Sequence, residues 1–134
     1  MSIIKSYTDL EQSRMLVKIL AIETSDYYYP VTYIEESTNK YLMCYIKPYI
    51  GRLSEVEYSV DTRLYIPCWS LAALLKCLSE IKSQVYTPVL FPSEGKWILR
   101  FVEYGHGNVC EVCDSSPVDA CIKVIEYLHE LNLL

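Results

Sequence analysis

Hydrophobic residues recur at helical spacing in three segments of the chain. The first segment opens with the sequence from Thr8 to Glu11, which is typical of a capping box with Thr8 as the cap. We expect this helix to end between Leu20 and Ser25. The second segment carries an apolar stripe of leucines, and Pro67 is compatible with its first turn.

The third helical segment has the clearest start. Ser116 is a favourable cap, Pro117 suits the first helical position, and Asp119 suits the positive end of the helix dipole. The residues predicted to form its buried face are Val118, Cys121, Ile122, Ile125 and Leu128.

Between the first two helices, the helical period gives way to short runs of β-branched and aromatic residues. Residues 31–36 and 41–47 flank a turn sequence and should pair as a hairpin. Residues 55–60 alternate between acidic or polar and apolar side chains, which predicts an amphipathic strand.

Three more short segments lie between the second and third helices, over residues 86–91, 97–104 and 109–114. Turn residues separate them, so we expect a three-stranded antiparallel meander in the C-terminal half. Residues 1–134 contain no internal repeat and no low-complexity linker. The sequence therefore predicts a single α+β domain with antiparallel sheet and about three helices packed on it.

Composition limits the classes of function. Hydrophobic residues make up 51% and charged residues 22% of the chain, which favours a packed core over disorder. The net charge is -5 and the basic residues are scattered, so we expect no nucleic-acid partner. The chain contains no long apolar run and does not open with a secretory signal pattern, which predicts a cytoplasmic protein without membrane contact.

Tyrosine is unusually frequent, with thirteen tyrosines against two phenylalanines. Three consecutive aromatic rings in an extended chain cannot all face one core, so at least one ring of residues 27–29 should be exposed. Exposed tyrosine is a favoured anchor in protein interfaces. We therefore predict a protein partner or a homo-oligomer, because exposed tyrosines and strand edges favour pairing. The predicted partner-binding residues are Tyr27, Tyr28, Tyr29, Tyr33 and Tyr45.

The sequence contains one C-x-x-C motif, Cys110 to Cys113, which is a pattern found in zinc sites and redox pairs. In a strand, three residues separate the two thiols by roughly 10 Å and place them on opposite faces. We therefore expect no metal and no cofactor. The alternative is a metal-binding or small-ligand-binding protein that uses Cys110 and Cys113 with His106 and Cys121 as further ligands.

No catalytic residue is predicted. The chain has two histidines, and neither lies beside a recognisable nucleophile, so an enzyme of the Ser-His-Asp or Cys-His type is hard to assemble. A small enzyme whose pocket uses tyrosine hydroxyls and carboxylates from separate strands remains an open alternative.

Residues 67–75 (PCWSLAALL) and 117–134 (beginning PVDAC and ending LHELNLL) resemble small proteins of unknown function from phages and mobile elements of gut bacteria. The resemblance covers two of the predicted helices. It implies a phage or mobile-element setting and brings no activity with it. Together with the exposed tyrosines, it favours a non-catalytic intracellular interaction or accessory protein.

Overall fold

The computed structural model describes residues 4–30, 32–35, 40–42, 48–51, 65–81 and 85–134. The chain divides into two compact units. The C-terminal unit comprises Ser70–Leu134 with the N-terminal segment through Thr8, and the N-terminal unit comprises Asp9–Trp69. Each unit is described below by itself.

The C-terminal unit contains the predicted meander. Its strands are β6 (Tyr86–Ser93), β7 (Lys96–Glu103) and β8 (Gly107–Asp114), antiparallel and in the order β6-β7-β8. Glu94 and Gly95, which join β6 to β7, both have positive φ angles of 51° and 79°. A two-residue hairpin turn with two positive φ angles matches the right-handed twist of the strands that it joins.

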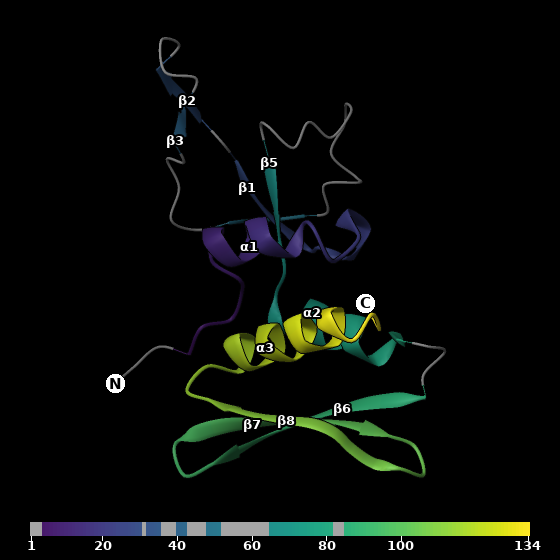
Figure 1. The fold of residues 1–134 in the computed structure, drawn as a ribbon. Helices are drawn as coiled ribbons and strands as arrows, with labels where there is room; N and C mark the ends of the chain where they lie inside the picture. The colour runs from purple at the N-terminus through teal and green to yellow at the C-terminus, as the bar shows by residue number, and fades with distance from the viewer. Residues whose placement is uncertain (1–3, 31, 36–39, 43–47, 52–64, 82–84) are drawn as a thin grey trace. The chain divides into compact units, whose positions relative to one another are not determined.

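Two helices, α2 (Leu71–Ser79) and α3 (Pro117–Glu130), lie on the same face of this sheet (Figure 1). The predicted start of α3 is confirmed, because the Asp119 amide donates to Ser116 Oγ at 3.2 Å and Pro117 lies in the first turn. All five residues predicted for its buried face are buried.

The predicted start of α2 at Pro67 is wrong. The cap is Ser70, whose hydroxyl oxygen accepts a hydrogen bond from the Ala73 amide at 3.1 Å. Pro67 instead lies in a strand, paired with Tyr28. That strand is at the edge of its sheet. An edge strand tolerates proline, because the side that lacks the N–H can face away from the neighbouring strand.

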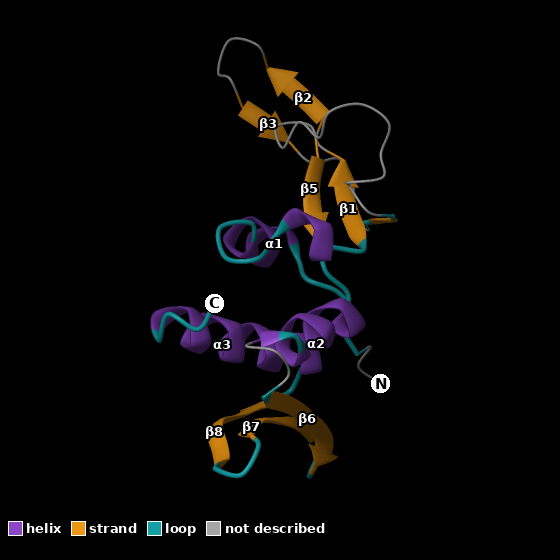
Figure 2. Ribbon diagram, turned by 90° about the vertical axis from the view of Figure 1, so that its right-hand side faces the viewer, coloured by secondary structure: helices purple, strands orange, loops and turns teal. Residues whose placement is uncertain are grey.

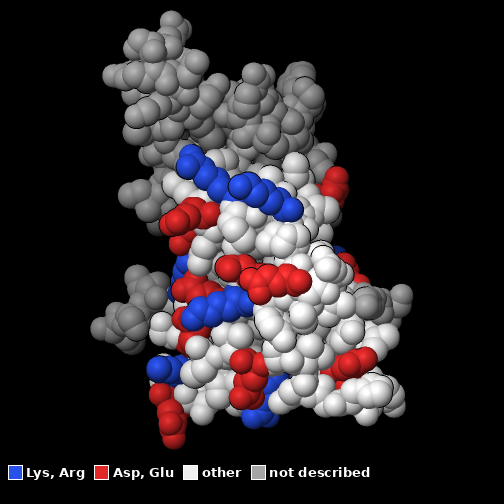
Figure 3. Space-filling view, in the orientation of Figure 1, with Lys and Arg blue, Asp and Glu red and all other residues white. Residues whose placement is uncertain are grey.

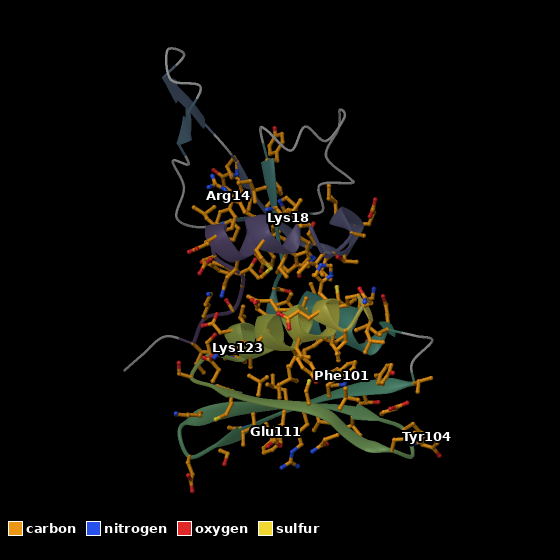
Figure 4. The ribbon with its side chains drawn as sticks, in the orientation of Figure 1. Arg14, Lys18, Phe101, Tyr104, Glu111 and Lys123 are labelled. Carbon is orange, nitrogen blue, oxygen red and sulfur yellow. The ribbon has the colours of Figure 1, made fainter. Side chains whose placement is uncertain are left out.

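The core of the C-terminal unit lies between the sheet and the two helices. Leu99 and Phe101 of β7 are fully buried, and Phe101 stacks on Tyr86 with 5.0 Å between ring centroids. Figure 4 shows Phe101 pointing toward the helices and Glu111 on the opposite side of the sheet. One face of the sheet is therefore covered within this unit and the other is not.

The described part of the N-terminal unit forms two small sheets (Figure 2). In the first, β1 (Tyr27–Pro30) lies between β4 (Tyr49–Ile50) and β5 (Tyr65–Cys68), and both pairings are antiparallel. In the second, β2 (Thr32–Glu35) pairs with β3 (Lys40–Leu42). This pairing confirms the predicted hairpin, whereas residues 43–47 and the predicted strand over 55–60 lie outside the described residues.

The first helix, α1 (Leu10–Leu16), packs against β5. Its cap is Asp9 rather than the predicted Thr8. The Gln12 amide donates to Asp9 Oδ1 at 2.8 Å and the Asp9 amide donates to Gln12 Oε1 at 3.0 Å. An aspartate is a better cap than a threonine, and it forms the same reciprocal box one residue later.

This helix is also shorter than expected. It ends at Leu16, and a 3-10 turn over Ile22–Thr24 follows. The predicted α+β class, with antiparallel sheets and α-helices packed on them, is confirmed. That the chain forms a single domain stays a prediction.

Candidate interaction surface

Tyr28 is the centre of an aromatic group on the first sheet of the N-terminal unit. The Tyr49 ring lies 5.8 Å away at an interplanar angle of 60°, and the Tyr65 ring lies 5.7 Å away at 81°. Both contacts have the edge-to-face geometry that aromatic quadrupoles favour. We call Tyr28, Tyr49 and Tyr65 the tyrosine cluster.

Strand pairing explains why these rings meet. Tyr28 on β1 lies directly opposite Tyr49 on β4, so their side chains share a face of the sheet. On the other side, β5 pairs with β1 in a register that places Tyr65 opposite Pro30, two residues from Tyr28. Side chains two residues apart on a strand also share a face.

Tyr27 and Tyr29 point to the other face of the same strand. Tyr29 is only 2% exposed and lies opposite Ile66, which is also buried. The prediction that Tyr29 binds a partner is therefore not supported, because its ring belongs to the core. Tyr27 and Tyr28 are half-buried, so none of the three rings is exposed as the sequence predicted, although alternation along the strand does point neighbouring rings to opposite faces.

The Tyr28 ring lies over Gly51. A Cβ atom added at Gly51 would lie 3.4 Å from Tyr28 Cε1, and the φ angle there is +145°, which side chains rarely adopt. The Gly51 amide also donates to the Asp26 carbonyl oxygen at 2.9 Å. These two contacts attach the end of β4 to the start of β1 and hold Tyr49 beside Tyr28.

The outer part of this surface is exposed and apolar. The exposed fraction is 47% for Tyr49 and 80% for Ile50, while Tyr28 and Tyr65 are half-buried. The cluster is thus anchored at its centre and open at β4. Such a rigid aromatic group with an exposed rim suits contact with another protein, because little side-chain entropy remains to be lost on binding.

The other predicted partner-binding residues lie elsewhere. Tyr33 is on β2, opposite Tyr41 of β3, and Tyr45 lies outside the described residues. Sequence reasoning did not single out Tyr49, Tyr65 or Ile50. The alternation around residues 27–29 predicts that one ring leaves the core, but the partners of that ring depend on pairing between distant strands.

The C-x-x-C motif lies in β8, as predicted. Cys110 is opposite Phe101, on the face that the helices cover, and Cys113 is opposite Ile98, on the other face. Both thiols are free. Opposite faces of one strand leave no position from which the two thiols bind one metal ion.

Burial also keeps the inner thiols protonated. It raises the pKa of Cys110, and it raises the pKa of Cys121 to about 12. A thiol, unlike a thiolate, is a poor nucleophile and a poor metal ligand. Among the residues that the structure describes, no group of three or more His, Cys, Asp and Glu side chains is arranged to hold a metal ion.

The two histidines are both exposed and lie apart in the fold. His106 is in the turn between β7 and β8, where its amide donates to the Glu103 carbonyl oxygen at 3.0 Å. His129 is in the last turn of α3, with Nδ1 2.9 Å from the Leu134 carbonyl oxygen.

Charges of both signs are mixed on the surface. Apart from Arg14 on α1 and Lys18 in the turn that follows it (Figure 4), basic side chains alternate with acidic ones on the face seen in Figure 3. This distribution differs from the basic stripe that binds nucleic acid. None of the helices in the described ranges has the length and apolarity needed to cross a bilayer.

No known protein family, no curated protein and no solved structure matches this chain. The phage or mobile-element setting therefore stays a prediction, and function has to be inferred from the residues and their geometry.

Proposed function

We propose that this chain is a non-catalytic protein-interaction module, an accessory factor that binds a protein partner through the tyrosine cluster and the adjacent Ile50. The observation that supports this most directly is the anchored Tyr28 with the half-exposed Tyr49 and the exposed Ile50 beside it. The resemblance of two helices to phage and mobile-element proteins gives the expected setting, the cytoplasm of a bacterial host.

The chemistry of the surface defines the partner that it fits. Tyrosine rings bury apolar area while their hydroxyls keep a hydrogen-bond partner, so the matching surface offers an apolar pocket bordered by carbonyl or carboxylate acceptors. A nucleic acid fits less well, because the protein is acidic and stacked bases bring a phosphate backbone with them.

Tyr49→Ser tests the proposal, because it removes an exposed ring while Tyr28 keeps its contacts with Tyr65 and Gly51. Tagged protein would be used to isolate the partner from the host, and the purified partner would be titrated by calorimetry. We expect Tyr49→Ser and Ile50→Ser each to weaken binding by tenfold or more, about 1.4 kcal/mol, as for interface anchors.

Tyr104→Ser is the matched control. Tyr104 is 88% exposed and lies in the turn between β7 and β8, so the same chemical change occurs away from the cluster. It should leave the affinity unchanged, and circular dichroism should show that all three variants fold. Equal affinity of the wild type and Tyr49→Ser, or equal losses in Tyr49→Ser and Tyr104→Ser, would refute the proposed surface.

A further inference from the structure

The open face of the β6-β7-β8 sheet, opposite α2 and α3, carries a central ion pair within an apolar surround. Arg100 on β7 lies directly across from Glu111 on β8, and Arg100 Nε donates to Glu111 Oε1. The side chains are 45% and 46% exposed. The apolar residues on the same face are Val89, Phe91, Ile98 and Val102.

This face is only partly covered by its own side chains. Val89 is 42% exposed, Phe91, Ile98 and Val102 are half-buried, and the Arg100 guanidinium lies 4.9 Å from the Phe91 ring centroid. A three-stranded sheet with a half-apolar face gains stability when a second sheet packs on that face.

We propose that the occupant of this face is a second copy of the same chain, packed face to face about a twofold axis. The axis runs parallel to the strands and passes between β7 and β8 at the ion pair. It places Arg100 of each copy over Glu111 of the other, because turning the face over exchanges the positions of the two strands.

Charge supports this occupant in two ways. The Arg100–Glu111 pair is neutral and becomes self-complementary in this orientation, so four charges alternate in sign across the interface. In addition, the chain carries a net charge of -5, whereas the charged residues that strand alternation places on this face are Lys96, Arg100 and Glu111. These charges sum to +1 on each face, so the repulsion between two acidic copies is smaller here than over the rest of their surface.

The size of the face sets the expected strength. With the axis between β7 and β8, these two strands of each copy lie over the partner and β6 lies beside the overlap, so the contact measures roughly 10 by 26 Å. Two such faces bury roughly 500 Å², which is below the range of stable interfaces, so we expect a weak dimer that dissociates at roughly submillimolar concentration.

Charge reversal on each side of the pair tests the proposal. Arg100→Glu gives a face with two adjacent acids, and Glu111→Arg gives a face with two adjacent bases. Sedimentation velocity over a concentration series, in reducing buffer because Cys113 is exposed, should show a monomer–dimer equilibrium for the wild type. Each single variant should dimerise at least tenfold more weakly.

Mixing distinguishes the interface from a loss of folding. An equimolar mixture of Arg100→Glu and Glu111→Arg should form a heterodimer, because the acidic face of one then meets the basic face of the other. The double variant Arg100→Glu/Glu111→Arg should recover the homodimer, and Glu126→Lys, a charge reversal at an exposed position of α3, should leave it unchanged. A wild type that stays monomeric at all concentrations, or single variants that dimerise like the wild type and show no preference on mixing, would overturn the proposal.

Discussion

The two three-stranded sheets in the part of the chain that the structure describes differ in how far apart along the sequence their strands lie. Strands β6, β7 and β8 have eight residues each and follow one another through short turns. In the N-terminal unit, β1 and β5 have four residues each and β4 has two, and β1 at Tyr27–Pro30 pairs with β5 at Tyr65–Cys68. The β6-β7-β8 sheet is formed by local pairing, and the β4-β1-β5 sheet is formed by long-range pairing.

The two sheets also differ in what their faces bury. The local sheet buries one face under two helices and has a regular core at Leu99 and Phe101. The long-range sheet buries Tyr29 on one face and gathers three tyrosines on the other. Long-range contacts have a larger loop-closure cost, so the N-terminal unit depends more on a few anchoring contacts.

The largest effect is expected from Phe101→Ala in the C-terminal unit. The substitution removes a fully buried ring that stacks on Tyr86, and this should lower the free energy of unfolding by about 3–5 kcal/mol. The measurement is the rate at which a thiol reagent labels Cys121 in that unit and Cys68 in the N-terminal unit, both fully buried. Labelling of Cys121 should accelerate by at least about a hundredfold, since 1.4 kcal/mol is a factor of ten.

The rate at Cys68 tests whether the two units are independent. If each unit opens separately, Cys68 should keep its wild-type rate in Phe101→Ala. Equal acceleration at both thiols would show instead that the chain unfolds as the single domain that the sequence predicts.

A smaller effect is expected from Thr24→Val in the N-terminal unit. The indole Nε1 of the buried Trp69 donates to Thr24 Oγ1 at 2.9 Å, and valine removes that acceptor. A buried donor that loses its acceptor lowers the free energy of unfolding by about 1–3 kcal/mol. Labelling of Cys68 should therefore accelerate in Thr24→Val. Thr24→Ser keeps the hydroxyl and should label close to the wild-type rate, so identical rates for the two variants would contradict this role of the hydrogen bond.

The helix caps allow a matched comparison of the two units. Ser116→Ala removes the cap of α3, and Asp9→Ala removes the cap of α1. Each should lower the free energy of unfolding by about 1 kcal/mol, measured in urea. Ser115→Ala changes the neighbouring exposed serine and should have little effect. A full loss in Ser115→Ala, with none in Ser116→Ala, would contradict the assigned cap.

The smallest effect concerns Asp114 and depends on pH. Burial would raise the pKa of Asp114, but hydrogen bonds from Lys123 and the Ser116 amide, with the Lys123 charge, outweigh it and hold that pKa below its ordinary value of 3.8. A pKa lowered by folding means that the ionised form stabilises the fold. This stabilisation is present above pH 3.8 and is lost as the pH falls through the lower folded pKa.

Asp114→Asn should therefore be less stable than the wild type at neutral pH, and the difference should shrink on acidification through that range. Urea unfolding at a series of pH values measures it. In a Lys123→Met background the difference should be smaller, because the main cause of the lowered pKa is gone. A difference that is constant with pH would show that the carboxylate charge has no role.

Local signals explain why the C-terminal unit was predictable. Ser116 and Pro117 specify where α3 begins, and the Glu94-Gly95 pair suits the turn between β6 and β7, so neighbouring residues encode both. The errors in the helices came from competing local signals of the same kind. Asp9 outcompetes Thr8 as a cap, and Pro67 is compatible with an edge strand as well as with a helix start.

The tyrosine cluster shows the limit of local signals. The alternation of residues 27–29 requires that neighbouring rings point to opposite faces, and this follows from the chain alone. Which face is buried, and which tyrosines meet Tyr28, depends on the register with β4 and β5. Helix caps, turns and side-chain alternation act between residues close in the chain. The pairing of β1 with β4 and β5, and the exposure of Tyr49 on β4, depend instead on the free energy of packing a whole unit.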